Sequence, residues 1–216
     1  MSNLLKIQYQ HIFLFDTGPL CDLKVNPLKD FLYFLKFEGQ KGIIDFSYSW
    51  EKDSLHSNLT IKENLLLDSI PTSLIRDNEN NLKEFFKTLE NPYLIKLFEA
   101  LGNLNDKVAN LSIERLKLTS LIKAMVSKSE FVFLVEPESF DSYETIATLK
   151  QCILFEVDTH QRKFMIKPSQ KETWLDITTH LITKDEKHSY IKKTIESTKS
   201  KQTSDIDHYQ EAKKIA

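Results

Sequence analysis

Glycine is scarce in this chain of 216 residues, which contains only four. Loops that cradle phosphate need glycine wherever the backbone must come close to an anion, because a side chain would keep the two apart. The scarcity of glycine therefore argues against an intact phosphate-binding site for a nucleotide.

Cysteine and long apolar runs are scarce as well. The only cysteines are Cys21 and Cys152, each in an apolar stretch. We expect two buried, reduced thiols in a cytoplasmic protein, because secreted disulfide scaffolds carry many more cysteines. No run reaches the roughly 18 apolar residues that a membrane-spanning helix needs, and no signal peptide opens the sequence.

The charges of the chain nearly balance, with 29 basic and 31 acidic side chains and a net charge of -2. This balance leaves no overall basic field to recruit nucleic acid, so we expect no nucleic-acid partner. The chain is 41% hydrophobic and 28% charged, which is ordinary for a soluble globular protein. Its length fits one domain, or one domain with an appendage.

The most informative stretch is LSIERLKLTSLIKAMVSKSEFVFLVEP, from Leu111 to Pro137. Its first part predicts a helix from the spacing of its apolar residues, and Ser112 can cap that helix by accepting a bond from a free backbone N–H. Residues 131–135 are continuously apolar, as in a parallel strand covered on both faces. Glu136 follows at the carboxyl end of this strand, where α/β sheets bind their ligands.

A second strand–loop–helix pattern lies near the start of the chain. Residues 4–15 predict a strand, and Pro27 fits the first turn of a helix. Between them, Gly18 and Lys24 match the first glycine and the lysine of the phosphate-binding loop GxxxxGK[ST]. A plain strand-to-helix loop with a solvated lysine is the alternative interpretation.

The rest of the chain predicts further strands and helices. Thr60 and Glu63 form a capping-box pattern. Cys152–Val157 predicts a strand that follows a short helix at 142–150, whereas a hairpin from Ile153 to Ile166 with His160 in its turn fits equally well. The other predicted elements are a strand at 43–48, helices at 80–90 and 92–101, and a strand or short helix at 174–182.

This set of motifs resembles that of the ABC-type ATPases. Their pattern of LSGGQ, a helix ending in ARAL, four apolar residues and Asp-Glu-Pro registers with residues 111–137 without a gap. Ser112 matches the serine of the signature motif, and Glu136 matches the glutamate. Ile113 and Glu114 replace the two signature glycines.

The resemblance extends to the start of the chain and to its middle. Gly18 and Lys24 match the phosphate-binding loop, in which Leu23 replaces the last glycine and Val25 replaces the hydroxyl residue that holds Mg²⁺. The segment Thr60–Asn64 is similar to the family's T-[VI]-[RK]-E-N, which opens the helical subdomain.

Further positions follow from the resemblance alone. Ser49 or Trp50 stands where the family carries a glutamine that contacts the metal and the attacking water. His160 stands in place of the switch histidine, with His180 as a later candidate. Asp141 matches the aspartate that contacts the opposite subunit.

We therefore predict an α/β fold of the P-loop NTPase type: a mainly parallel sheet flanked by helices, with an inserted helical subdomain and a reduced N-terminal β lobe. Residues 1–183 would form one degenerate ABC-type nucleotide-binding domain, with its helical subdomain at about 60–125. Residues 184–216 are charged, with few large apolar side chains, and predict a tail that is helical or disordered. An unrelated α/β domain is the other interpretation.

The replacements coincide with the groups that the family uses to hold magnesium and triphosphate. Val25 and Val135 take the place of two metal-associated residues and offer no oxygen to a hard cation. We therefore expect no metal site and no cofactor, with ATP binding as the alternative. The vestigial catalytic positions would be Glu136 and His160, and the vestigial nucleotide-binding positions would be Gly18, Lys24 and Ser112.

The resemblance implies a catalytically inactive ABC ATPase-like subunit with a structural or regulatory role. Its partner would be an active ATPase subunit, a second copy of the chain, or a membrane permease. Such a protein is cytoplasmic, and peripheral on the inner face of the membrane when a permease holds it. The alternative is a divergent, working ATP-binding ATPase that uses Lys24, Glu136 and His160 and is completed by residues of a partner.

Overall fold

The computed structural model describes the chain over residues 11–16, 27–50, 54–67, 78–140, 142–185 and 189–195, with 78–81 described by backbone alone. Gly18 and Lys24 of the predicted phosphate-binding loop lie outside these ranges, as do Cys21 and Asp141. Within them, no helix combines the length and the apolar character needed to cross a bilayer.

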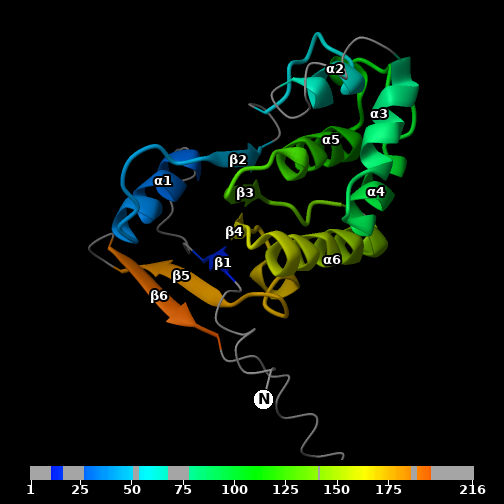
Figure 1. The fold of residues 1–216 in the computed structure, drawn as a ribbon. Helices are drawn as coiled ribbons and strands as arrows, with labels where there is room; N and C mark the ends of the chain where they lie inside the picture. The colour runs from blue at the N-terminus through cyan, green and yellow to red at the C-terminus, as the bar shows by residue number, and fades with distance from the viewer. Residues whose placement is uncertain are drawn as a thin grey trace, which may run out of the picture.

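The strands in the described ranges form one sheet, in the order β2-β3-β4-β1-β5-β6 (Figure 1). All pairs are parallel except β5 with β6. The prediction of a mainly parallel α/β sheet is therefore confirmed. The strands are β1 Ile12–Phe15, β2 Phe46–Ser49, β3 Phe131–Val135, β4 Lys163–Lys167, β5 His180–Lys184 and β6 Tyr190–Thr194.

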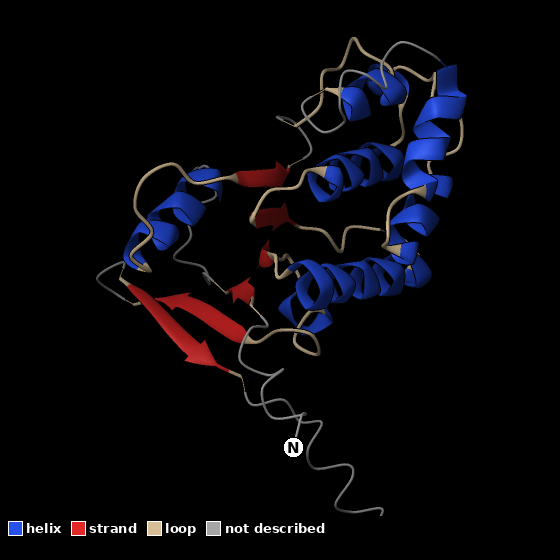
Figure 2. Ribbon diagram, viewed as in Figure 1, coloured by secondary structure: helices blue, strands red, loops and turns tan. Residues whose placement is uncertain are grey.

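Helices cover both faces of the sheet (Figure 2). Helix α1 lies on one face, whereas α5 and α6 lie on the other, with α2, α3 and α4 beyond them (Figure 1). Their bounds are α1 Pro27–Phe37, α2 Ile61–Leu66, α3 Asn78–Lys87, α4 Pro92–Glu99, α5 Ile113–Val126 and α6 Tyr143–His160. The helices α2 to α5 occupy the stretch between β2 and β3, where the sequence predicts an inserted helical subdomain.

Alternate side chains of the central strands enter two separate cores. Phe13, Phe133 and Met165 stand side by side across β1, β3 and β4 and pack into the aromatic cluster under α1. Their neighbours Val132 and Phe164 point to the opposite face and pack with α5 and α6. This two-sided burial is why β3 is apolar at every position, as the sequence predicts.

The helix and strand predicted at 111–137 are present as α5 and β3. Ser112 caps α5, because its hydroxyl accepts a hydrogen bond from the backbone N–H of Arg115 at 3.3 Å. The Arg115 side chain in turn donates to the carbonyl of Leu101 at 3.0 Å and pairs with Asp106 at 2.7 Å. The start of α5 is therefore tied to the end of α4.

Thr60 and Glu63 form the predicted capping box at the start of α2. The Thr60 hydroxyl accepts from the Glu63 N–H at 3.2 Å, and the Glu63 carboxylate accepts from the Thr60 N–H at 2.8 Å. The second bond lowers the pKa of Glu63. Asn64 is fully buried and bonds to both the N–H and the carbonyl of His56, at 2.7 and 3.0 Å. The segment that resembles the family motif thus fixes the entry to α2.

Helix α6 corrects the prediction for the segment that ends at His160. Both the strand at Cys152–Val157 and the hairpin from Ile153 to Ile166 are wrong, because α6 continues without a break to His160. Its buried positions recur at helical spacing: Thr148, Leu149, Cys152, Ile153, Glu156 and Val157. Burial raises the pKa of the Cys152 thiol, which is free and unexposed as the sequence predicts.

Strand β6 corrects part of the prediction for the tail. The sequence predicts a solvated helix or disorder from residue 184 onward, yet Tyr190–Thr194 pair antiparallel with β5. The Tyr190 ring packs on Phe34 and Phe37 of α1, and its hydroxyl donates to the carbonyl of Asp30 at 2.8 Å. One aromatic side chain therefore anchors a strand whose other residues are largely polar.

A buried ion pair joins the end of α6 to α4 and α5. Arg162 and Glu156 lie 3.0 Å apart, and Asn91 donates to Glu156 at 2.8 Å. The remaining N–H groups of Arg162 donate to backbone carbonyls, including those of Met125 at 2.7 Å and Ser127 at 2.6 Å. Because these carbonyls close α5, the arginine caps that helix with a positive charge.

Two histidines lie together at the amino end of the sheet. The rings of His11 and His180 are 6.0 Å apart and both stack near Phe13. Burial lowers the pKa of each, and the positive charge of Lys192 lowers both further. Protonation of either ring therefore costs more free energy in the folded chain than in the unfolded chain.

We predict that acid destabilises this corner of the sheet. The unfolded chain binds these protons more readily, so the free energy of unfolding should be fully retained above about pH 6.5 and fall as the pH drops below it. Urea unfolding near neutral pH and about one pH unit below 6.5 measures the difference. His180→Phe should reduce this difference in the free energy of unfolding between the two pH values. His160→Gln, at an exposed helix end, should leave the difference unchanged. Equal acid sensitivity in both variants would contradict the assignment.

Candidate functional site

The carboxyl ends of β1, β2, β3 and β4 meet along one edge of the sheet, because these strands are parallel. This is the edge at which open α/β sheets hold their ligands. The described residues that directly follow these strands are Asp16, Trp50, Glu136 and Pro168. We therefore take this edge as the candidate functional site.

Glu136 lies at the centre of this edge and is exposed. Its φ of 47° places it in the left-handed region, which residues other than glycine rarely adopt. The backbone is held there on both sides: its N–H donates to the carbonyl of Lys167 at 2.7 Å, and its carbonyl accepts from the Ser139 hydroxyl at 3.0 Å. The strand end is thus fixed while the residue stays open to solvent.

Glu138, two residues further on, lies at the same edge, and no motif in the sequence singles it out. Its side chain is buried, and one carboxylate oxygen accepts from the N–H and hydroxyl of Ser169 and from the N–H of Gln170. The other oxygen accepts from the indole N–H of Trp174 at 3.0 Å. A single carboxylate therefore ties the loop after β3 to the loop after β4.

Hydroxyl groups close the edge at the end of β2. Ser49, the last residue of the strand, is buried and lies 2.9 Å from the hydroxyl of Ser120 in α5. Ser54 bonds to the same hydroxyl at 2.5 Å, and Lys123 donates to the carbonyl of Ser54 at 3.1 Å. Ser49, one of the two residues at the family's glutamine position, is therefore engaged within the protein.

The end of β1 and the end of β3 differ in polarity. Asp16 pairs with Lys171 at 2.8 Å, and this bond raises the pKa of Lys171. Val135, the last residue of β3, is half-buried and packs against the aromatic cluster under α1. In the described part of the chain, no group of three or more acidic, histidine or cysteine side chains is placed to hold a metal ion.

His160 lies away from this edge, which corrects its predicted position. It is the last residue of α6, and β4 begins at Lys163, so His160 lies beside the amino ends of the strands. His180, the later candidate, begins β5 and lies at the same amino edge. At the carboxyl end of β4 the chain carries Lys167, Pro168 and Ser169. Of the predicted catalytic residues, only Glu136 lies at the candidate site.

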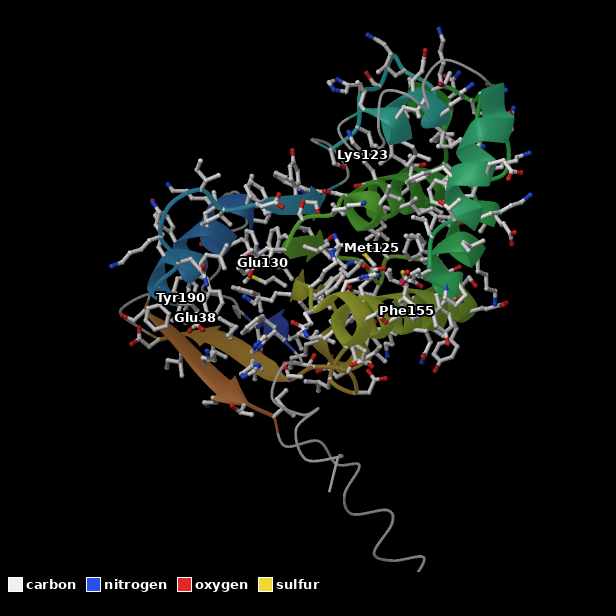
Figure 3. All side chains as sticks on the ribbon, viewed as in Figure 1. Glu38, Lys123, Met125, Glu130, Phe155 and Tyr190 are labelled. Carbon is white, nitrogen blue, oxygen red and sulfur yellow. The ribbon has the colours of Figure 1, made fainter. Side chains whose placement is uncertain are left out.

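A large hollow among the described residues lies at the opposite edge of the sheet. It is a groove of about 1290 Å³ between the amino ends of β3 and β4 and the helices α3 and α4. Its polar floor is Asn91, Glu156 and Arg162, which satisfy one another as described above. In Figure 3 the labelled Met125 and Glu130 mark two of its walls. The charges of Glu156 and Arg162 therefore stabilise the packing of the helices at this floor.

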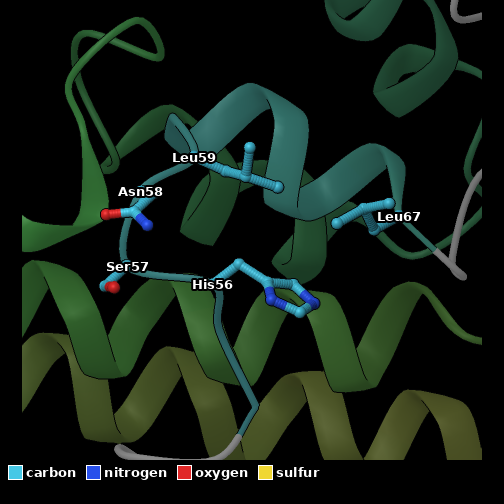
Figure 4. A pocket seen from close by; sticks show the side chains of 5 residues that line it. All are labelled: His56, Ser57, Asn58, Leu59 and Leu67. Atoms are coloured by element: carbon cyan, nitrogen blue, oxygen red, sulfur yellow. The ribbon is translucent and has the colours of Figure 1, made fainter.

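A smaller hollow of about 370 Å³ lies beside α2. Figure 4 shows the ring of His56 with the side chains of Leu59 and Leu67 around it. The backbone of His56 is held by Asn64. Ser57 also lines this hollow, but its described lining contains no acidic side chain to orient His56, so we do not assign it chemistry.

No protein family model and no curated protein matches the sequence. Among solved structures, an ATP binding subunit of an ABC transporter aligns with a TM-score of 0.61 at 14% identity, over 86% of this chain and 79% of that chain. The structure titled RNase-L Inhibitor aligns with a TM-score of 0.56 at 13% identity, over 85% of this chain. The chain has the fold of an ABC-type ATPase.

A third similar structure is the complex of archaeal ribosomal stalk protein aP1 and archaeal ribosome recycling factor aABCE1, with a TM-score of 0.58 at 13% identity. The present chain spans 34% of the matched chain there and 34% of RNase-L Inhibitor. The resemblance seen at residues 111–137 is thus confirmed for the fold.

We predict that Glu138 stabilises this edge far more than Glu136. Glu138→Gln replaces an acceptor by an amide that faces several donors, which should cost about 1–3 kcal/mol in the free energy of unfolding. Amide exchange at Ser169 and Gln170 should also accelerate. Glu136→Gln is the matched control, two residues away and exposed, and should leave both unchanged. Urea unfolding and hydrogen exchange measure the two effects, and equal losses would contradict the prediction.

Proposed function

We propose that this chain is a catalytically inactive ABC ATPase-like subunit that acts as a structural or regulatory partner in an ABC-type complex. The fold provides the scaffold of such a subunit. The candidate edge differs from that of an active family member in the side chains that would hold magnesium and ATP. One observation carries it: Val135 at the end of β3, where the family places its metal-binding aspartate, is part of the apolar packing under α1.

Valine at this position removes an oxygen that Mg²⁺ requires, because a hard cation binds oxygen ligands. A replacement on the surface could be compensated by a nearby carboxylate. Val135 instead contacts the core, and Glu136 belongs to no group of three or more acidic, histidine or cysteine side chains placed to hold a metal ion in the described residues. Phosphoryl transfer depends on such positioning and charge neutralisation. The described part of this edge therefore does not fit a magnesium nucleotide.

Two other family positions support the same conclusion. Ser49 is bonded to Ser120 and cannot replace a glutamine that must reach towards water. After β4, Ser169 stands near the place of the switch histidine and is held by Glu138. Polar groups remain at these strand ends, but they bond to each other.

The proposed partner surface lies on the same side of the molecule. Helix α5 precedes β3 by a short turn and α6 follows it, so both helices begin near the carboxyl edge. Each begins with an exposed apolar residue: Ile113 is 70% exposed and Tyr143 is 83% exposed. Exposed apolar side chains at this edge favour pairing with an ABC ATPase subunit, a second copy or a permease.

The purified chain should neither bind nor hydrolyse ATP. Calorimetric titration with Mg²⁺-ATP should give no saturable heat, and phosphate release should equal that of Glu136→Gln, because the metal ligands are replaced. The working-enzyme alternative makes the opposite prediction. Micromolar binding that Lys24→Ala abolishes, with turnover that Glu136→Gln abolishes, would establish a divergent ATPase.

A tagged chain should recover an ABC ATPase or permease subunit from its source cells, identified by mass spectrometry, or should dimerise with itself in size-exclusion chromatography. Ile113→Asp combined with Tyr143→Asp should abolish that association, because two charges would enter the apolar contact. Leu175→Asp, at an exposed apolar residue elsewhere, is the matched control and should retain it. Recovery of no such subunit together with a monomeric chain would refute the partner role.

A further inference from the structure

The outer face of α1 exposes large apolar residues beside lysines. Tyr33 is 49% exposed and Phe37, one helical turn later, is 55% exposed. Ile43, in the loop that follows the helix, is 103% exposed. In Figure 1, α1 forms the outer layer on its side of the sheet, and no other described helix covers it. Burial of α1 against the sheet therefore leaves these side chains open to a partner.

Three lysines flank these apolar side chains. The ammonium groups of Lys29 and Lys36 lie 5.7 and 6.0 Å from the centre of the Tyr33 ring, and Lys41 is exposed between Phe37 and Ile43 in the sequence. We call Lys29, Tyr33, Lys36, Phe37, Lys41 and Ile43 the lysine–aromatic face. Its lysines form no ion pair with a carboxylate in the described ranges.

Two acidic residues of this segment pair with lysines outside the face. Asp30 is buried and pairs with Lys184 at 2.7 Å, and Glu38 pairs with Lys192. Asp45 lines the groove at the amino edge of the sheet. The lysine–aromatic face is therefore positive, although the whole chain carries a net charge of -2.

The helix that carries the lysine–aromatic face is held firmly against the rest of the protein. Helix α1 is held by Phe31 and Phe34 in the aromatic core and by the Tyr190 hydroxyl, which donates to the Asp30 carbonyl at 2.8 Å. Glu38 and Tyr190 lie together where α1 meets β6 (Figure 3). Gly39, with a φ of 84°, ends the helix in the left-handed conformation that glycine adopts without strain. Because α1 is already ordered, less conformational entropy is lost when its outer face binds a partner.

We propose that the lysine–aromatic face binds the surface of an anionic lipid membrane. Aromatic and aliphatic side chains beside lysines suit the interface of a bilayer, where the apolar groups enter the headgroup region and the cations meet lipid phosphates. A peptide enclosed in a groove would need a hollow at this face, and neither described hollow includes any of its residues. The positive charge and the exposed apolar side chains of the face favour the membrane.

This inference is independent of the proposed partner role. Phe37 and Ile43 precede β2, so this end of the face lies towards the amino edge of the sheet. Ile113 and Tyr143 lie towards the carboxyl edge. A chain that binds lipid could therefore still pair with an ATPase subunit, and failure of one proposal leaves the other standing.

Co-sedimentation with lipid vesicles tests the inference on the full chain. The chain should bind vesicles of phosphatidylcholine with phosphatidylglycerol and not those of phosphatidylcholine alone. The triple variant Lys29→Glu, Lys36→Glu, Lys41→Glu should weaken binding at least about tenfold, since each lysine contributes to attraction by an anionic surface. The matched control carries the same charge change on exposed lysines away from the face, two in α3 and one in the loop before β3: Lys83→Glu, Lys87→Glu and Lys128→Glu.

The aromatic side chains separate lipid binding from general attraction to polyanions. Tyr33→Ala with Phe37→Ala should weaken vesicle binding at least about threefold, because the loss of buried ring area weakens insertion, while soluble polyglutamate should not compete. The indole introduced by Phe37→Trp should shift its emission to the blue on anionic vesicles. Absence of vesicle binding overturns the inference, as does equal weakening by the control triple. Competition by polyglutamate without dependence on the rings also overturns it, in favour of an acidic protein partner.

Discussion

The burial of the central parallel strands on both faces is the constraint on which the rest of this structure depends. Phe133 enters the aromatic core under α1, and its neighbour Val132 enters the core under α5 and α6. With both faces occupied, no side chain within β3 is available for chemistry, and polar groups have to lie at the strand ends. The fold therefore separates what stabilises the protein from what could act on a ligand.

That separation allows residues at the strand ends to vary without disturbing the two cores. The strand ends still carry polar groups, but Glu138 holds the loop after β4, Ser49 bonds to Ser120, and Asp16 pairs with Lys171. Each of these contacts joins two segments that are far apart in the sequence. The edge is thus stabilised by contacts between its own side chains, which leave the packing of the two cores unaffected.

The sequence predicted the elements whose local pattern agrees with their packing. An apolar run for β3, a serine cap for α5 and a capping box at Thr60 are all local features. The prediction for α6 is wrong because Cys152–Val157 is apolar enough to suggest a strand. The helical spacing of its buried residues follows from packing against α4 and the sheet, which the local sequence does not reveal. The prediction also failed for β6, where Tyr190 alone supplies the anchor, and for Glu138, which in the sequence is one more acidic residue in a loop.

The corrected position of His160 bears on the choice between the two proposed functions. A working enzyme of this type would use Lys24, Glu136 and His160 together. His160 closes α6 at the amino edge of the sheet, on the far side from Glu136, and the residue nearest the switch position is Ser169, which Glu138 restrains. A single glutamate beside Val135 supplies too few oxygen ligands to hold a hard cation, and its negative charge does not neutralise the charge that develops in phosphoryl transfer. The geometry of the described edge therefore favours a subunit that retains the ABC-type scaffold for assembly.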